Sequence, residues 1–171
     1  MTDLQTFHLP KSITGTQSDI DTAREIIQAW RTDGIFQVAT NTIQDRKTES
    51  AFEASRRFFR MPMKFKSQCI SDLNYGGYIA SGEEVTAGES DYSEIYTICK
   101  DTPLNDACVQ AQWPCHGPMP WPDEEYHQSM KVFIDELGLI GEKLLKLTAL
   151  GLGLDDINAL TKLTRDGWHH M

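Results

Sequence analysis

The chain has 171 residues, of which 40% are hydrophobic and 24% charged, and its mean hydropathy is −0.41. This composition is typical of a globular protein with a packed core, and it excludes collagen-like and intrinsically disordered chains. Lys and Arg total 16 against 25 Asp and Glu, and the resulting formal charge of −9 repels phosphate backbones and anionic lipid. Nucleic acid is therefore not an expected partner.

No apolar run reaches the roughly 18 residues that a membrane span needs, and the N-terminus has no basic stretch followed by an apolar segment. We therefore expect a cytoplasmic protein that does not enter a membrane. The cysteines form no C-x-x-C pair and are too sparse to staple a chain of this length, which predicts reduced thiols packed mostly as small apolar residues. They are Cys69, Cys99, Cys108 and Cys115.

Apolar residues recur at helical spacing in several stretches. In the first, Ser18 is the expected N-cap with Asp21 as its capping-box partner, the apolar face is Ile20, Ala23, Ile27 and Trp30, and Gly34 ends the pattern. In the second, Ala51, Phe52, Ser55, Phe58 and Phe59 share one side and Pro62 forbids continuation. The longest repeat carries Met130, Phe133, Ile134, Leu137, Ile140, Leu144, Leu147 and Leu150. The predicted helices are about 19–33, 45–60, 122–151 and 155–163.

Short strands are expected where β-branched and aromatic residues cluster. They are Ile35 to Val38, Tyr78 to Ala80, Glu94 to Cys99 and an opening strand at Trp168 to Met171. Between Met61 and Pro122 only short strands fit, because Gly and Pro interrupt the pattern. The predicted fold class is α+β. So few strands cannot form a closed barrel or a double sheet, so the rest of the sheet is expected downstream of Met171.

Acidic residues dominate the stretch from Ser67 to Cys99, which contains no Lys or Arg. They are Asp72, Glu83, Glu84, Glu89, Asp91 and Glu94. A Gly-bracketed acidic loop, residues 82–88, can receive a cationic ligand, since carboxylates accept charge-assisted hydrogen bonds from a guanidinium. The alternative is a solvated acidic loop, which the spacing alone favours. Glu89, Asp91 and Glu94 are expected to be solvated.

An anion site and a metal site are two further possibilities. Basic residues near the end of the second helix either bind an anion or only complement the helix dipole, and we favour the second reading. They are Arg56, Arg57, Arg60, Lys64 and Lys66. Adjacent His169 and His170 would point to opposite faces of a strand, and Cys115-His116 has no second pair at zinc spacing. We therefore predict no metal site.

Four stretches in fixed order resemble one family. They are WRTDGIFQV from Trp30, RFFRMPMKFK from Arg57, YGGYIASGEEVTAG from Tyr75, and LLKLTALGL from Leu144. Together they resemble the N-terminal region of the iron(II)- and 2-oxoglutarate-dependent dioxygenases. GEEVTAG, WPCHGPMPWP and LTRDGWHHM are most similar to the microbial ethylene-forming members. The resemblance covers essentially the whole chain and implies the helical and short-strand region that flanks a double-stranded β-helix, or jelly roll, truncated before most of the barrel.

The resemblance also implies chemistry for the complete protein. Such an oxygenase uses Fe(II), dioxygen and 2-oxoglutarate, forms ethylene from 2-oxoglutarate, and hydroxylates L-arginine with succinate release. The family's His-x-Asp and distant His, which hold iron, have no counterpart here, so the catalytic core is expected after residue 171 and no catalytic residue or metal ligand is assigned. The isolated chain is expected to be inactive and monomeric; the alternative is a truncated, non-catalytic fragment that acts as a binding or interaction module.

Within this span the resemblance implies part of an L-arginine site. The matching positions are Glu84, as acceptor for the guanidinium, and Thr86, as a hydroxyl or backbone contact. Glu83 and Val85 are expected to shape the loop, which belongs to a substrate segment of about 75–100. Gly77 departs from the family pattern, which has a bulkier small residue at this position.

Overall fold

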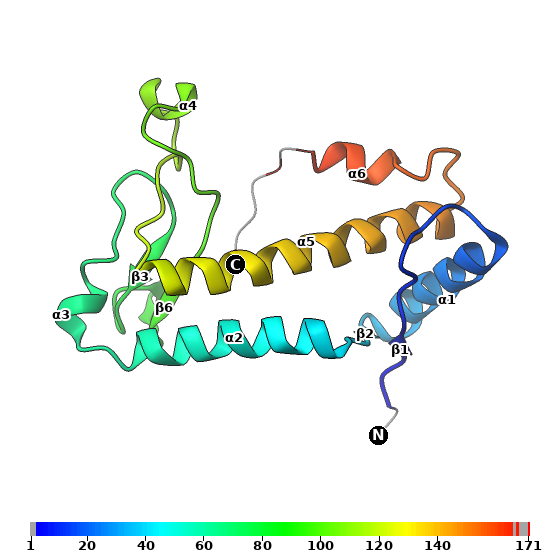
Figure 1. Ribbon diagram of the computed structural model, residues 1–171, viewed down its shortest axis with the longest axis horizontal. Coiled ribbons are helices and arrows are strands. Elements are labelled where there is room, and N and C mark those ends of the chain that lie inside the picture. The colour runs from blue at the N-terminus through cyan, green and yellow to red at the C-terminus, as the bar shows by residue number, and fades with distance from the viewer. Residues whose placement is uncertain (1–2, 166, 168–170) are drawn as a thin grey trace. The chain divides into compact units, whose positions relative to one another are not determined.

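A computed structural model of the protein describes residues 3–165, 167 and 171 (Figure 1). The chain divides into two compact units, one of residues 1–48 with 132–167 and one of residues 49–131 with 168–171. Helices α2 (Thr42–Phe59) and α5 (Glu124–Gly151) contribute residues to both units. The unit of residues 1–48 with 132–167 is called the first unit, and the other the second unit. None of the described helices is both long and apolar enough to cross a membrane.

The first unit contains a minimal parallel sheet. Strand β1 (Thr6–Phe7) pairs with β2 (Gln37–Val38), with Phe7 opposite Val38. Strand β2 is shorter than predicted, and Ile35 is 55% exposed. Helix α1 (Gln17–Asp33) joins the two strands, and α6 (Ala159–Leu163) lies near the end of the described chain.

The core of the first unit forms where α1 meets β1 and the second half of α5. Its buried members are Phe7, Ile13, Ala23, Ile26, Ala29 and Leu147. Helix α1 buries Ala23 and Ile27 of the predicted stripe, whereas Trp30 is 42% exposed and lies against Phe36. The prediction for this face is therefore confirmed at Ala23 and Ile27 and wrong at Trp30. Ile26 and Ala29, which the prediction did not include, are buried as well.

The N-terminus of α1 corrects the predicted cap. Thr16, not Ser18, is the N-cap, and its hydroxyl accepts from the Asp19 amide at 3.2 Å. One oxygen of the buried Asp19 carboxylate accepts from the amides of Thr14, Gly15 and Thr16, each at 3.0 Å. The backbone hydrogen bond from Thr14 contributes most to lowering the pKa of Asp19, because it stabilises the charged form.

The second unit contains an antiparallel pair, a hairpin and two short helices. Strand β3 (Gly77–Ile79) pairs with β6 (Ile95–Thr97) (Figure 1). In this register Tyr78 lies opposite Tyr96. The hairpin joins β4 (Val85–Thr86) to β5 (Glu89–Ser90). Helices α3 (Met63–Lys66) and α4 (Ala107–Gln110) contradict the expectation of strands alone between Met61 and Pro122. Four-residue helices are too short to produce a detectable apolar repeat.

Met171 forms hydrogen bonds with the residue that follows β6. The predicted strand at Trp168 to Met171 lies outside the described residues except for Met171. Its amide donates to the Ile98 carbonyl at 2.9 Å, and the Ile98 amide donates to the Met171 carbonyl at 2.8 Å. Such a reciprocal pair is the hydrogen-bond pattern of antiparallel strands.

Aromatic rings fill the core of the second unit. Phe58 of α2 lies 4.9 Å from the Tyr96 ring centroid, 5.6 Å from Tyr126 and 5.9 Å from Tyr78. The prediction for this helix face is wrong at Phe52, which is 56% exposed. Cys69 and Cys99 are buried free thiols, as predicted, whereas Cys115 is exposed.

Helix α5 also departs from a uniform apolar stripe. Met130 and Leu147 are buried as predicted, but Leu137 is 44% exposed. The helix starts at Glu124, two residues after the predicted start, and ends at Gly151. Helix α6 starts at Ala159 rather than near residue 155.

Candidate functional site

The acidic loop predicted from the sequence is a β-hairpin, β4–β5. Thr86 pairs with Glu89 and Val85 with Ser90. The two residues between the strands, Ala87 and Gly88, have φ values of 53° and 90°. Positive φ at both positions is what a two-residue type I′ hairpin turn requires, and its twist matches that of the flanking strands. The turn therefore fixes which side chains share a face.

The hairpin has one acidic face. Side chains of directly paired residues lie on the same face, and alternate residues along a strand return to that face. Thr86 thus shares a face with its partner Glu89 and with Glu84, while Val85 lies on the other face with Ser90. Glu84 is partly buried, whereas Glu89 and Val85 are exposed. The register therefore brings the two predicted ligands, Glu84 and Thr86, together.

Hydrogen bonds inside the loop hold this geometry. The Asp91 amide donates to the Glu84 carbonyl at 2.8 Å, and the Thr86 hydroxyl donates to the Asp91 carboxylate at 2.8 Å. The Glu83 carboxylate accepts from the Ala80 amide at 3.0 Å. Glu83 therefore closes the turn before the hairpin, and Asp91 has a structural role that the sequence did not indicate.

A buried ion pair lies at the end of the acidic segment and corrects the expectation for Glu94. The sequence suggested a solvated carboxylate, but both Glu94 oxygens lie 2.6 Å from the Lys66 ammonium, and one accepts from the Tyr78 hydroxyl at 2.9 Å. The side chains of Lys66 and Glu94 are only 6% and 28% exposed. The ammonium lowers the pKa of Glu94, and the carboxylate raises the pKa of Lys66.

Gly77, at the start of β3, is required by the local geometry. Its φ is +109°, and a Cβ at this position would lie 2.5 Å from the Cys69 carbonyl oxygen. The Cys69 carbonyl accepts from the Tyr78 amide at 2.7 Å, so it cannot move away without breaking that bond. Gly77 therefore allows two backbone segments to approach each other closely.

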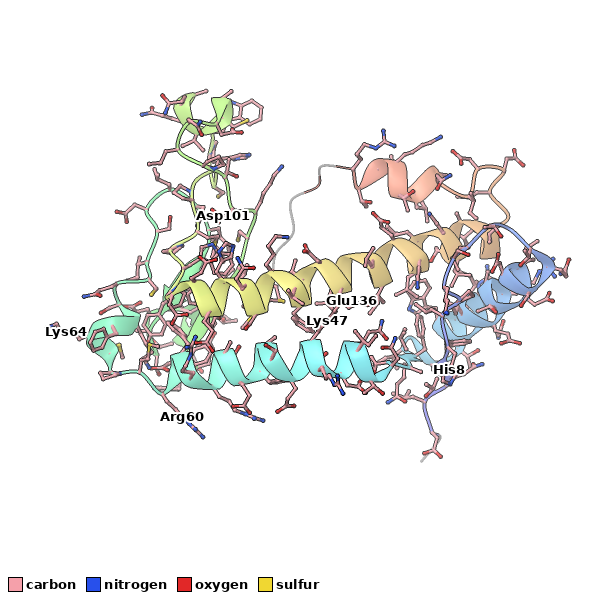
Figure 2. The ribbon with its side chains drawn as sticks, viewed as in Figure 1. His8, Lys47, Arg60, Lys64, Asp101 and Glu136 are labelled. Atoms are coloured by element: carbon pink, nitrogen blue, oxygen red, sulfur yellow. The ribbon has the colours of Figure 1, made fainter. Side chains whose placement is uncertain are left out.

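A second carboxylate also fixes this unit. Asp101 accepts from the Met119 amide at 2.8 Å and from the Trp121 indole N–H at 2.7 Å, which ties the segment after β6 to the proline-rich loop (Figure 2). The sequence did not indicate Asp101 or Tyr78 as important, and it placed Lys66 with the cations near the end of the second helix rather than with Glu94. Each makes its contact with a residue far away in the sequence, so no spacing pattern could reveal it.

The basic residues do not form an anion site together. Arg57 pairs with Asp123 at 2.9 Å and also with Glu125, while Arg56 pairs with Glu53. Arg60 and Lys64 point away from the ribbon (Figure 2). Lys66 pairs with Glu94. Arg56, Arg57 and Lys66 therefore bind carboxylates of the protein itself.

Metal ligands are not gathered anywhere in residues 3–165, 167 and 171: these residues contain no group of three His, Cys, Asp or Glu that could hold an ion.

Comparison with known proteins gives the family. Residues 2–124 match the family described as non-haem dioxygenase in morphine synthesis, N-terminal. The chain is 55% identical over all 171 residues to a 2-oxoglutarate-dependent ethylene/succinate-forming enzyme of Ralstonia nicotianae, of which it covers 50%. It is 30% identical over 129 residues to a 2-oxoglutarate-dependent dioxygenase of Monascus ruber, covering 64% of this chain and 39% of that protein.

Solved structures show the same fold. A Caulobacter crescentus protein described as a member of the 2OG-Fe(II) oxygenase family superposes with a TM-score of 0.75 at 17% identity, over 99% of this chain and 55% of that one. A full-length Neurospora crassa protein in complex with alpha-KG gives a TM-score of 0.69 at 22% identity, over 91% and 49% of the two chains. The chain spans about half the length of the curated relatives that it matches. It belongs to the non-haem, 2-oxoglutarate-dependent dioxygenases and matches their N-terminal region.

Proposed function

We propose that this chain is the arginine-binding portion of an oxygenase that forms ethylene from 2-oxoglutarate and hydroxylates L-arginine with release of succinate. The observation that carries the proposal is the 55% identity, over the whole chain, to a relative named as an ethylene/succinate-forming enzyme. The acidic face of the β4–β5 hairpin supports the choice of a cationic substrate.

In this proposal Glu84 accepts hydrogen bonds from the guanidinium of L-arginine. A carboxylate offers two oxygens to the planar N–H fork, and such charge-assisted bonds are stronger than neutral ones. Among the described residues no hydrogen bond or ion pair to the Glu84 carboxylate is found, in contrast to Glu83 and Glu94. Glu84 shares this availability with Glu89, but of the two only Glu84 is partly buried, so it is the one that we assign to the ligand.

Thr86 contributes through its hydroxyl oxygen. Because the hydroxyl hydrogen is donated to Asp91, the lone pairs remain for a donor from the substrate. The neighbouring carboxylate thus orients Thr86 as an acceptor, which suits a guanidinium or an ammonium. Glu83 and Val85 shape the loop, Glu83 through its bond to Ala80.

Fe(II) and 2-oxoglutarate supply oxygen activation in this family, and we propose that the part of the full-length protein not matched by this chain holds both. The residues described above bind and orient the substrate only. A carboxylate held by the hairpin register places the guanidinium at a fixed position, which is what a site needs when a reactive centre must face one carbon of the substrate.

The test compares Glu84→Gln with Glu89→Gln in the full-length protein. Loss of a charged hydrogen bond in a partly closed site costs about 1.5 to 3 kcal/mol, so Glu84→Gln should weaken L-arginine binding roughly 10- to 100-fold. It should also suppress ethylene formation and arginine hydroxylation, with iron and 2-oxoglutarate binding unchanged. Arginine titration calorimetry and ethylene gas chromatography on the same preparations measure these effects.

Glu89→Gln is the matched control because it removes the same charge from the same face at an exposed position. An exposed charge contributes less than about 1 kcal/mol, so this variant should be nearly silent. Equal loss of arginine affinity in both variants would show that the hairpin acts as a diffuse acidic patch and that Glu84 is not a specific ligand.

A further inference from the structure

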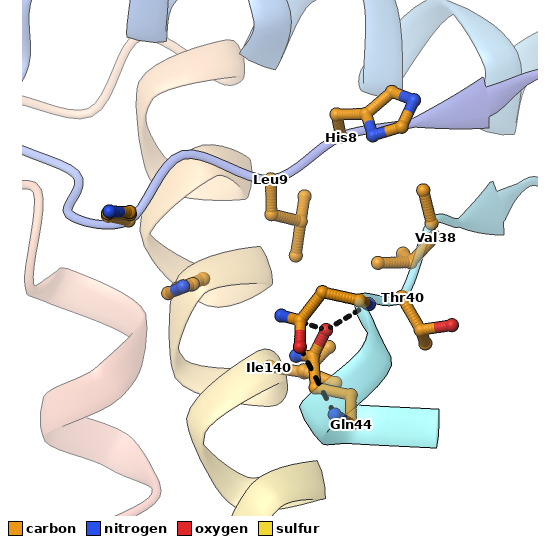
Figure 3. A pocket seen from close by; sticks show the side chains of 10 residues that line it. His8, Leu9, Val38, Thr40, Gln44 and Ile140 are labelled. Carbon is orange, nitrogen blue, oxygen red and sulfur yellow. Dashed lines mark hydrogen bonds between the residues drawn. The ribbon is translucent and has the colours of Figure 1, made fainter. Parts of the chain in front are cut away.

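A pocket of about 260 Å³ lies within the first unit (Figure 3). Three segments line it: the residues after β1, the stretch from β2 into α2, and one turn of α5. Its volume lies just below the range of pockets for drug-sized ligands, so it suits a small molecule. None of its lining residues belongs to the hairpin that we propose for arginine.

The charge of this pocket is opposite to that of the chain. Its lining includes Lys11, Lys143 and His8 but no carboxylate, although the protein carries a formal charge of −9. Neither lysine takes part in the ion pairs found within the described residues. Two lysines therefore line a pocket to which no acidic side chain contributes.

Glu136 is an acidic residue that interacts electrostatically with Lys143, but other residues are its direct partners. It accepts from the Lys47 ammonium and, at 2.7 Å, from the Gln44 amide; Figure 2 shows Lys47 and Glu136 pointing toward each other. The pKa of Glu136 is lowered chiefly by Lys47, and Lys143 contributes least among the causes. The ion-pair partner of Glu136 is thus Lys47 and not Lys143.

The pocket wall is also ordered before any ligand arrives. The Gln44 side-chain oxygen accepts from the Asn41 amide at 2.9 Å and from the Asn41 side chain at 2.8 Å (Figure 3). Gln44 is held at its other end by Glu136. Leu9, Val38 and Ile140 supply apolar surface beside these polar groups. A wall held in place by its own hydrogen bonds reduces the entropy that binding must overcome.

We propose that this pocket binds a small aliphatic carboxylate, with the carboxylate between Lys11 and Lys143 and the hydrocarbon chain against Leu9, Val38 and Ile140. Because two lysines and no carboxylate line the pocket, it favours an anionic ligand. Because part of the wall is apolar, it favours an anion with a short hydrocarbon chain over a fully hydrated inorganic ion. The site is independent of the arginine proposal, since it shares no residue with it.

The experiment titrates the full-length protein with butyrate, with butan-1-ol as a neutral analogue and with inorganic phosphate, by ligand-observed NMR or calorimetry. Butyrate should bind more tightly than either probe, and added salt should weaken it. Lys143→Gln should raise the butyrate Kd about five- to tenfold, and Lys11→Gln, at a more exposed position, about two- to fivefold. Lys143→Arg should restore binding.

Lys64→Gln is the control, because it removes the same charge from an exposed residue outside the pocket. Circular dichroism and thermal unfolding check that the variants stay folded. Equal binding of butan-1-ol would overturn the role of charge, and equal binding of phosphate would overturn the role of the apolar wall. An unchanged butyrate Kd in folded Lys143→Gln, or the same loss in Lys64→Gln, would overturn the site itself.

Discussion

Lys66 and Glu94, 28 positions apart in the sequence, form a buried ion pair in which the ammonium lies 2.6 Å from both carboxylate oxygens. Lys66 ends α3, Glu94 immediately precedes β6, and Tyr78 of β3 donates to the same carboxylate. The pair therefore ties a short helix to both strands of the β3–β6 sheet, between which the β4–β5 hairpin is inserted in the chain. Its strength determines how firmly the base of that hairpin is held.

Removal of either partner should destabilise the protein, but not equally. Glu94→Ala leaves an ammonium that is 6% exposed, whereas Lys66→Met leaves a carboxylate that is 28% exposed and reached by water. Because an unpaired buried charge is the costly product, we expect about 3 kcal/mol for Glu94→Ala and about 1 to 2 kcal/mol for Lys66→Met. Urea unfolding followed by near-UV circular dichroism measures both; the reverse order would contradict the burial argument.

The same pair predicts a pH dependence. Lys66 lowers the pKa of Glu94, so the pair contributes stability above the ordinary glutamate value of about 4.3 and loses it as pH falls through the lowered pKa. Asp19 and Glu136 have lowered pKa values as well and act in the same direction. Glu94→Gln should therefore lose less stability than the wild type between about pH 5 and 3, as urea midpoints at each pH would show. If the wild type and Glu94→Gln lost the same stability over this pH range, protonation of Glu94 would not contribute to acid destabilisation.

Long periodic segments were predictable from the sequence, and non-local contacts were not. Helices α1 and α5 carry apolar repeats over many turns, so their existence followed from spacing. The hairpin turn escaped prediction because Ala87 adopts a positive φ without the Asn-Gly or Asp-Gly signal of such turns.

In the candidate site, too, local features could be predicted from the sequence and contacts between distant segments could not. Glu84 and Thr86 could be singled out from a charge-rich loop and a family resemblance, but their shared face depends on the register of β4 against β5. Glu94 was grouped with the solvated acids because nothing near it in the sequence is basic. Its partner comes from another helix, which only the folded chain brings near.

Gly77 should tolerate no side chain. In Gly77→Ala the new Cβ would meet the Cys69 carbonyl oxygen at 2.5 Å at a φ of +109°, so strain and clash add, and we expect a loss of about 3 kcal/mol or more. Gly82→Ala is the matched control: its φ is +88°, but nothing lies within 4 Å of the added Cβ, so about 1 kcal/mol is expected. Thermal unfolding compares them, and equal losses would mean that φ alone, not close packing, requires Gly77.

The cap of α1 offers a direct choice between two acids. Asp19 accepts three backbone N–H groups and is buried, whereas the Asp21 side chain is 57% exposed and interacts with Arg24 and Gln17 on the helix surface. Asp19→Ala should cost about 2 kcal/mol and Asp21→Ala less than about 0.5 kcal/mol. Denaturant unfolding of the two variants tests this, and a larger effect at Asp21 would restore the cap expected from the sequence.

Asp91 should influence arginine binding through Thr86, provided that the proposed function holds. Its carboxylate accepts a hydrogen bond from the Thr86 hydroxyl, and its backbone amide donates to the Glu84 carbonyl. Asp91 therefore positions both proposed ligands but does not itself contact the substrate in this proposal. Asp91→Asn keeps an oxygen that can accept the hydroxyl, whereas Asp91→Ala frees the hydroxyl to rotate. We therefore expect the L-arginine Kd to rise about three- to tenfold in Asp91→Ala and less than about threefold in Asp91→Asn, with 2-oxoglutarate affinity unchanged in both. Arginine titration calorimetry of the full-length protein separates the roles: if both variants weaken arginine binding to the same extent, the negative charge of Asp91, rather than its orientation of Thr86, is what the substrate senses.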